Sequence, residues 1–324
     1  MAAIPFVPRI DDSPYATAEQ LSPLIRRVIA ENPSKFTYRG TGTYIVGTRD
    51  VVVIDPGPRL DSHRDALQRA LEGCTVVGIV VTHCHADHSP LAEWLKKSTG
   101  APTYALGPHA DVVFDADDIE EEDDDDDDDD TTGVDAQSDE PRETIDIDFR
   151  PDVTVVDGDM FLTTDEFSLV AVATPGHTSN HLCVALPEEK ALFTGDHIMG
   201  WSTTVVSPPD GDMGEYMASL QKVADRGDAT LYPTHGGPIT DPAPFLAAYA
   251  THRRERESQI LDQLATGPKT IREMVSVMYA DVDKKLHKPA RRSVWSHLIQ
   301  LHREGRVTVV DGDTPRRTST YAKA

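Results

Sequence analysis

The chain has 324 residues, of which 39% are apolar, and its formal net charge is −24. This length allows one large domain and a smaller one, and the apolar fraction is sufficient for a buried core. No segment approaches the ~18 apolar residues of a membrane span, and residues 1–5 lack the basic and apolar regions of a secretory signal. Three cysteines provide no disulfide framework, which suits a reducing compartment. We therefore expect a cytoplasmic protein with no membrane partner.

A group of potential metal ligands directly follows a predicted strand. Residues 76–81 are apolar and mostly β-branched, which predicts a buried strand. The next residues contain a His-x-His-x-Asp-His run: His83, His85, Asp87 and His88. These side chains suit zinc, and open α/β layers bind ligands at the carboxyl ends of their strands. Cys84 lies within the run, but the turn should point its thiol away from the ligands, so we interpret it as a small buried residue.

An acidic segment follows and explains most of the net charge. Residues 111–148 contain 21 Asp or Glu and one Arg, so they carry −20 of the total −24. Residues 120–130 are all acidic, and such a run predicts a disordered loop that touches no ligand. We favour a solvated insertion. The alternative is an acidic decoy for a basic partner or for a basic face of the same protein.

Three further ligand candidates lie farther along the chain, each just after a short apolar stretch that is typical of a strand. They are His177, Asp196 and His235. The set of seven ligands matches the number that two zinc ions need when they share a bridging carboxylate and a bridging water. The alternative is a scatter of surface histidines, since the chain has 13. The spacing of the first run and the repeated strand-end setting favour the metal site.

The carboxyl-terminal part has the pattern of a winged helix. Residues 251–264 predict a helix, and Thr270 is the expected cap of a second one. Pro289 is expected to open a third helix that ends at Gly305, and residues 307–310 predict a strand that precedes a final extended piece.

This part of the chain is basic. Residues 269–306 contain nine Lys or Arg and four acidic residues, a local charge of +5. Such a surface could hold the phosphates of a nucleic acid. It could equally be a lid that packs beside the metal cleft. We favour the lid, and RNA remains a possible partner.

Taken together, the motifs resemble those of the metallo-β-lactamase superfamily. The seven ligand candidates fit its later motifs, and Asp55 fits the first one, a structural aspartate beneath the site. The resemblance covers about residues 35–250. It implies an α/β fold, the αββα sandwich, in which two mixed sheets pack face to face with helices outside. With the tail, the chain resembles the β-lactamase-like protein 2 group. We therefore predict a metallo-β-lactamase-fold domain at 1–250, which contains the acidic insertion, and a small winged-helix domain at 251–324.

The resemblance also assigns roles to the ligands. His83, His85 and His177 would hold one ion, and Asp87, His88 and His235 the other. Asp196 would bridge them. Zinc lowers the pKa of bound water to about 7, so a metal-bound hydroxide would be the nucleophile.

Two residues are candidates for a catalytic role, Asp87 and His181. Asp87 is also an expected ligand. His181 lies four residues after His177 and could donate to a developing oxyanion or a phosphate. The alternative is a histidine that only supports a ligand.

The resemblance narrows the reaction class. Common zinc β-lactamases carry a cysteine where this chain has Asp196, and an aspartate there is similar to the hydrolase branches. We predict a zinc-dependent hydrolase of an ester, a thioester or a related small substrate. The alternative is a single-strand endoribonuclease, a phosphodiesterase of the β-lactamase-like protein 2 type. A redox role with iron ranks lower, because iron use in this fold generally comes with a Glu where His85 stands. The sequence does not predict an oligomeric state.

Overall fold

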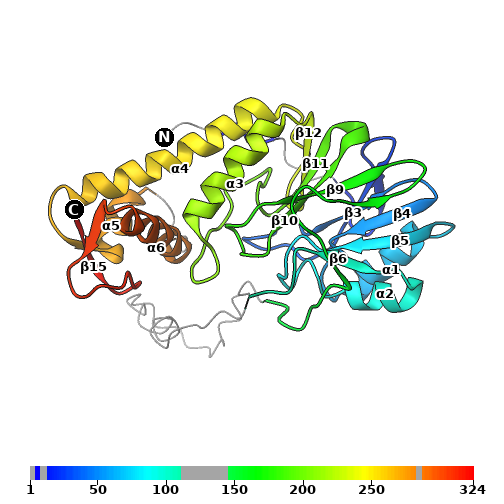
Figure 1. Ribbon diagram of the computed structural model, residues 1–324, viewed down its shortest axis with the longest axis horizontal. Helices are drawn as coiled ribbons and strands as arrows, with labels where there is room; N and C mark the ends of the chain where they lie inside the picture. The colour runs from blue at the N-terminus through cyan, green and yellow to red at the C-terminus, as the bar shows by residue number, and fades with distance from the viewer. Residues whose placement is uncertain (1–3, 8–12, 111–144, 282–286) are drawn as a thin grey trace, which may run out of the picture.

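Two β-sheets pack face to face, and helices cover both outer faces (Figure 1). The computed structural model describes residues 4–7, 13–110, 145–281 and 287–324. The first sheet pairs its seven strands in chain order: β1 (Ala18–Gln20), β2 (Ile25–Ile29), β3 (Gly42–Val46), β4 (Asp50–Ile54), β5 (Thr75–Val80), β6 (Thr103–Ala105) and β7 (Val153–Thr154). β1 to β4 are antiparallel and β4 to β7 are parallel, so this sheet is mixed.

The second sheet is also mixed. Its five strands lie in the order β12 (Thr230–Pro233), β11 (Ala191–Gly195), β10 (Leu182–Leu186), β9 (Ser168–Ala173) and β8 (Met160–Thr163). β11 and β12 are parallel, and the other pairs are antiparallel. A short 3₁₀ helix, η3 (Pro187–Glu189), connects β10 to β11.

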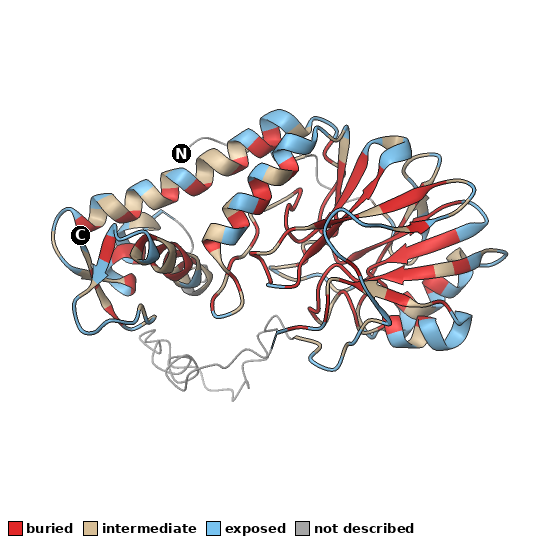
Figure 2. Cartoon of the chain, in the orientation of Figure 1, coloured by how far each residue is buried: buried red, intermediate tan, exposed pale blue. Residues whose placement is uncertain are grey.

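The sheets are held together by alternating side chains. In β4, Val52 and Ile54 pack between the two sheets, while Val51 and Val53 pack on the outer side. This is the period of two expected for a strand that is buried on both faces. The outer side is covered by α1 (Asp61–Ala70) and α2 (Ala92–Thr99). Figure 2 shows the same burial through both sheets, with exposed residues along the outer sides of the helices.

The outer face of the second sheet is covered by α3 (Met213–Arg226) and α4 (Pro242–Leu264). Tyr216 of α3 and Phe245 and Tyr249 of α4 pack against Cys183 and Leu192 of the sheet. The predicted αββα arrangement is therefore confirmed. Within the described residues, no helix combines the length and the apolarity that crossing a bilayer requires.

A winged helix follows, as predicted. It consists of β13 (Lys269–Thr270), α5 (Ile271–Met278), α6 (His287–Arg303), β14 (Val307–Val309) and β15 (Thr320–Lys323), with strand order β13-β15-β14. Thr270 caps α5 as expected. Its side chain accepts from the backbone of Glu273, whose carboxylate accepts from the Thr270 backbone in return. α6 begins at His287, two residues before the predicted Pro289.

The prediction for residues 251–264 was wrong about where the helix begins. α4 already begins at Pro242, and Pro244 lies in its first turn. Proline is tolerated there, because the first N–H groups of a helix have no partner within it. α4 therefore crosses residue 250, and one continuous helix extends from the sandwich to the winged helix (Figure 1). No element ends at the predicted domain boundary.

The predicted end of the acidic insertion, residue 148, lies too far along the chain. Residues 111–144 lie outside the described part of the chain, so the expected disorder is not tested. Ile145 forms an antiparallel bridge with His85, and the backbone N–H of Asp146 donates to the Cys84 carbonyl at 2.7 Å. The expectation that the insertion touches no ligand is therefore wrong at residue 145.

Deleting residues 115–140 should leave the melting temperature and the zinc content unchanged. A segment with this charge contributes no apolar core, and the deletion keeps Ile145 next to His85. A deletion of 115–148 is the control, and it should lower the zinc content because it removes that contact. A large loss of stability in the shorter deletion would show that the segment packs.

Candidate metal centre

All seven predicted ligands meet at one edge of the sandwich, just beyond the carboxyl ends of β5, β9, β11 and β12. They fall into two groups, and within each group the ligand atoms lie within 4.8 Å of one another. The first group is His83, His85, His177 and Asp196, and the second is Asp87, His88 and His235. Residues that are up to 152 positions apart therefore form one site, as the strand-end pattern indicated.

The Asp196 carboxylate lies between the two groups. Its Oδ1 is 3.5 Å from Nε2 of His88 and 3.4 Å from Nε2 of His235. Its Oδ2 is 3.8 Å from Nε2 of His177. The residue before it, Gly195, has a φ of +49°, and a Cβ there would lie only 2.7 Å from Nε2 of His181. Only glycine fits this approach, which brings Asp196 into position.

Two of these ligand atoms are buried without a hydrogen-bond partner in the described part of the chain: Nε2 of His88 and Oδ1 of Asp196. An unsatisfied buried polar atom costs about 1–3 kcal/mol, so such atoms need an explanation. Nε2 of His83 and Nδ1 of His85 face each other at 2.9 Å, which brings two ligand-type nitrogens to one point. Metal ions bound at the two groups would satisfy these four atoms, and imidazole and carboxylate donors fit zinc.

The other ring nitrogen of several ligands is held by the protein. Nδ1 of His88 donates to Asp55 at 2.8 Å, that of His177 donates to the Val205 carbonyl at 2.6 Å, and that of His235 donates to the Gly40 carbonyl at 3.2 Å. Each bond places the proton on Nδ1 and leaves Nε2 with a free lone pair. This is the arrangement that orients histidine ligands in metalloproteins.

Asp55 organises the floor of the site. Its carboxylate accepts from the backbone N–H and the hydroxyl of Thr82 at 2.8 Å, from Nδ1 of His88 at 2.8 Å and from the Thr234 hydroxyl at 3.3 Å. The residue is 1% exposed and has a φ of +50°. Asp55 therefore connects the ends of three strands, β4, β5 and β12.

The two groups differ in their electrostatics. Burial holds the pKa of His83 well below its usual value and lowers the pKa of His85 to about 3, so these rings are neutral. Burial also opposes protonation of His88, but the Asp87, Asp196 and Asp55 carboxylates outweigh it and hold that pKa well above its usual value. The second group is therefore a buried place where positive charge is stabilised.

His181 lies beside the ligands but is directed into the protein. Its side chain is 0% exposed, its Nε2 accepts from the Asp196 backbone N–H at 3.2 Å, and its Nδ1 lies 2.8 Å from the Thr174 hydroxyl. Because Nε2 acts as an acceptor, the single proton of the neutral ring lies on Nδ1 and points to Thr174. No N–H is left for an oxyanion, so these contacts favour the alternative of a supporting histidine.

Cys84 is buried and belongs to neither ligand group. Its sulfur accepts from the side-chain amide of Asn180 at 3.1 Å. Burial raises the pKa of the Cys84 thiol to about 11, so the thiolate that a metal would need is disfavoured. These contacts agree with the interpretation of Cys84 as a buried residue that is not a ligand.

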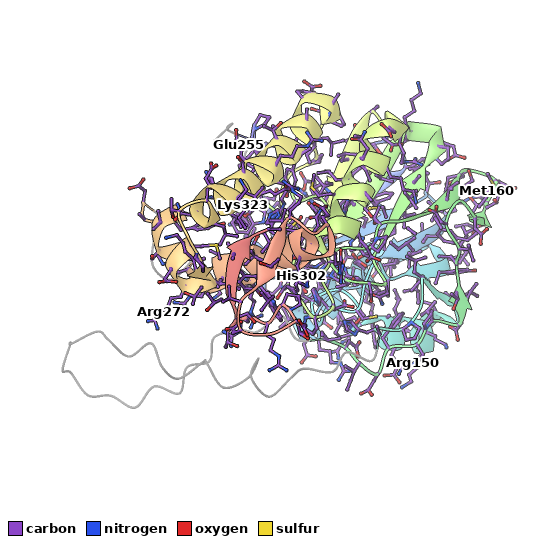
Figure 3. The ribbon with its side chains drawn as sticks, turned by 60° about the vertical axis from the view of Figure 1, so that its left-hand side comes forward. Arg150, Met160, Glu255, Arg272, His302 and Lys323 are labelled. Atoms are coloured by element: carbon purple, nitrogen blue, oxygen red, sulfur yellow. The ribbon has the colours of Figure 1, made fainter. Side chains whose placement is uncertain are left out.

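A pocket of about 110 Å³ opens beside the first ligand group and is lined by both parts of the chain. His85 and His177 line it together with Arg292, Trp295 and Arg317 of the winged helix. Figure 3 turns the winged helix, with His302 and Lys323, toward the viewer. This placement agrees with the predicted lid. Nothing in the local sequence pattern indicated which tail residues would line the pocket.

The loop that follows Asp196 is held by α4, a link that sequence analysis missed. The Thr204 hydroxyl donates to the Asp196 carbonyl at 2.8 Å, and the Tyr249 hydroxyl accepts from the Thr204 N–H at 3.0 Å. Arg253, which is buried on the same helix, donates to the Thr204 carbonyl. The helix that leads to the tail therefore also fixes the backbone of the central carboxylate.

Comparisons with known proteins agree with this geometry. Residues 38–235 match the Metallo-beta-lactamase superfamily, and residues 270–316 match the Beta-lactamase associated winged helix domain. The chain is 30% identical over 273 residues to an atrochrysone carboxyl ACP thioesterase of Claviceps purpurea, covering 83% of this chain and 74% of that protein. It is also 30% identical over 318 residues to a beta-lactamase-like protein 2 homolog of Drosophila melanogaster, covering 95% and 94%.

Solved structures show the same fold over nearly the whole chain. A beta-lactamase domain protein from Burkholderia ambifaria matches with a TM-score of 0.74 at 18% identity, covering 97% of this chain and 96% of that one. A metallo-beta-lactamase family protein from Thermus thermophilus matches with a TM-score of 0.69 at 22% identity, covering 94% and 100%. With its matched domains and its His and Asp ligand groups, the chain belongs to the metallo-β-lactamase superfamily.

Proposed function

We propose that this protein is a zinc-dependent hydrolase that binds two ions and cleaves a small ester or thioester. The observation that carries the proposal is the Asp196 carboxylate, which faces one ligand group with each oxygen and has its Oδ1 buried without a hydrogen bond in the described residues. A carboxylate placed in this way suits a bridge between two cations, because each oxygen can bind one of them.

His83, His85 and His177 would hold one ion, Asp87, His88 and His235 the other, and Asp196 would bridge them. A zinc pair, when bound, would supply an activated water and polarise the bond to be cut. Asp87 is the more accessible of the two ligand carboxylates, with a side chain that is 25% exposed against 9% for Asp196. We assign Asp87 the role of orienting the attacking water as a hydrogen-bond acceptor, while Thr41 holds its Oδ2 at 2.8 Å.

The pocket supports a small substrate. It reaches His85 and His177, and Val205, Pro208 and Pro209 give part of its wall an apolar surface that would exclude water from the bond to be cut. Thioesters come first among the candidates, because the 30% identical relative from Claviceps purpurea is a thioesterase. Asp196, at the place where common zinc β-lactamases have cysteine, argues against a β-lactam as the main substrate.

The second candidate is cleavage of single-stranded RNA. Two arginines of the basic tail line the pocket, as phosphate recognition requires. We rank RNA lower, because the net charge of −24 opposes the approach of a polyanion. That repulsion acts within a Debye length of roughly 8 Å at physiological salt.

A parallel substrate screen tests the proposed function. The zinc-loaded protein is offered generic thioesters, phosphodiesters, a β-lactam and a single-stranded RNA, with the Asp196→Ala protein as the blank. We expect zinc-dependent turnover of thioesters that is absent from the blank. Turnover of RNA alone would replace the proposal with the second candidate.

Elemental analysis of protein purified without a chelator should find two zinc ions per chain. Seven ligands in two groups provide three protein ligands for each ion and one shared carboxylate. Dialysis against a chelator should abolish hydrolysis, and added zinc should restore it. A ratio that stays at one or below after zinc is offered would contradict the binuclear site.

A further inference from the structure

The part of the pocket wall that the winged helix contributes is basic. Arg292 and Trp295 come from α6, and Arg317 comes from the segment between β14 and β15. Building on the proposed hydrolase, we propose that this wall binds an anionic group of the substrate, a carboxylate or a phosphate, while the bond to be cut lies at the metal ligands. The substrate class would then be a small thioester that carries an acid.

The basic wall is built rigidly. The indole N–H of Trp295 donates to the Pro315 carbonyl at 3.0 Å, which ties α6 to the segment that carries Arg317. The same segment is fixed by the Tyr321 hydroxyl, which donates to the Arg316 carbonyl at 2.5 Å. Preorganised groups lose little entropy when a ligand binds, which favours specific recognition.

The charges in the wall favour an anion. Asp210 is the carboxylate of the pocket lining outside the ligand groups, and it is already engaged by Nε2 of His109 at 3.2 Å and by the N–H of Ser179 at 3.1 Å. Its hydrogen bond to His109 raises the pKa of that ring, which favours the charged pair. Part of the charge of Asp210 is therefore already offset, whereas Arg292 is exposed in the described structure.

Arg303 and Arg292 lie on the same helix but differ in their ion pairing. Arg303, the last residue of the same helix, lines a second pocket that shares Trp295 with the first, and it pairs with Asp212. For Arg292, the described residues offer no hydrogen bond or ion pair. A guanidinium binds a carboxylate or a phosphate through two parallel N–H groups, so Arg292 can take the acid of a substrate as Arg303 takes Asp212.

Steady-state kinetics with paired substrates test this assignment. The neutral probe is S-acetyl-N-acetylcysteamine. The acidic probes are S-succinyl-N-acetylcysteamine, which carries a carboxylate, and the acetyl thioester of a thiol that carries a phosphate monoester. Arg292→Gln should raise KM for an acidic probe roughly tenfold and leave the neutral probe within about twofold. The acidic probe with the larger effect identifies the acid.

Arg272→Gln is the matched control, since it removes one charge from α5 outside the linings of both pockets (Figure 3). It should change the kinetics of neither substrate. Arg292→Lys should restore part of the preference, because lysine keeps the charge but not the fork. Equal effects of Arg292→Gln on neutral and acidic probes would overturn the assignment.

A binding measurement separates failure of this inference from failure of the proposed hydrolysis. If no thioester is turned over, the hydrolase proposal fails, and calorimetry of succinate and inorganic phosphate with the zinc-loaded protein still tests the wall. Binding weakened roughly tenfold by Arg292→Gln and unchanged by Arg272→Gln would support it. Equal binding by the wild type, Arg292→Gln and Arg272→Gln would overturn the inference. So would tight, salt-sensitive binding of single-stranded RNA that Arg292→Gln abolishes, with no preference between neutral and acidic thioesters.

Discussion

Replacing Asp196 with alanine should reduce kcat/KM for the best thioester by at least ~10²–10³-fold, as loss of a central electrostatic group does in other enzymes. The carboxylate faces both ligand groups, with Oδ1 3.4 Å from His235 and Oδ2 3.8 Å from His177. Its removal should also lower the zinc content from two ions to one or fewer, because it takes a ligand from each ion. Elemental analysis and initial rates measure the two effects separately.

Asp196→Asn sharpens this prediction. The amide keeps the shape and one oxygen, but its nitrogen cannot bind a cation, so we expect almost the same loss of zinc as with alanine. Asp165→Asn is the control, because Asp165 is an exposed aspartate in the turn between β8 and β9. It should keep full zinc content and activity. Full zinc content in both Asp196 variants would refute the bridging role.

The grouping of the candidate metal ligands could be predicted from the sequence because both their type and their setting are local. His83 and Asp87 follow a strand that the apolar run at residues 76–81 already indicated, and His177 and Asp196 each end a short apolar stretch. The sheets place the carboxyl ends of these strands at one edge, so side chains that directly follow the strands are expected to lie close together. The two layers of the sandwich followed from the resemblance rather than from the residues alone.

The features that sequence analysis missed depend on contacts between distant residues. Tyr249 and Arg253 hold the loop at Thr204, about 45–49 residues away, and nothing in the local pattern of α4 indicates this contact. The wall formed by Arg292 depends on how the winged helix docks beside the ligand edge. The start of α4 was missed because Pro242 is compatible both with a loop and with the first turn of a helix.

The role of His181 also depends on a contact that the sequence does not show, because that contact determines which ring nitrogen carries the proton. Its spacing from His177 allowed either a donor to the substrate or a supporting residue. The backbone N–H of Asp196, which donates to Nε2 of His181, favours the supporting role because it fixes the tautomer. The spacing of the histidines predicts that His181 lies near the ligands. It does not predict a hydrogen bond to a residue 15 positions away.

Asp55→Ala should lower the free energy of unfolding by about 3–5 kcal/mol, the range for breaking a buried charged network. Asp55 is 1% exposed, and its removal leaves the N–H of Thr82 and Nδ1 of His88 without their acceptor. Alanine is also strained at the φ of +50° that Asp55 adopts. Denaturant unfolding of the zinc-free proteins measures this loss without a contribution from the metal.

Asp55→Asn separates the fold from the metal site. Asparagine tolerates a positive φ, and its amide oxygen can still accept from the N–H of Thr82, so it should be the more stable of the two variants. If its amide nitrogen faces Nδ1 of His88, that ring must move its proton to Nε2, the atom directed at Asp196. Zinc affinity should then fall by about 10–100-fold in both variants.

Asp50→Asn is the control for the Asp55 variants, because Asp50 begins the same strand and is exposed. It should match the wild type in unfolding and in zinc titrations. Wild-type zinc affinity in Asp55→Asn would show that the His88 tautomer does not depend on Asp55. The hydrogen bond between them would then stabilise only the fold, and the orientation of His88 would have to come from its packing against the ring of His83, 4.1 Å away between ring centres.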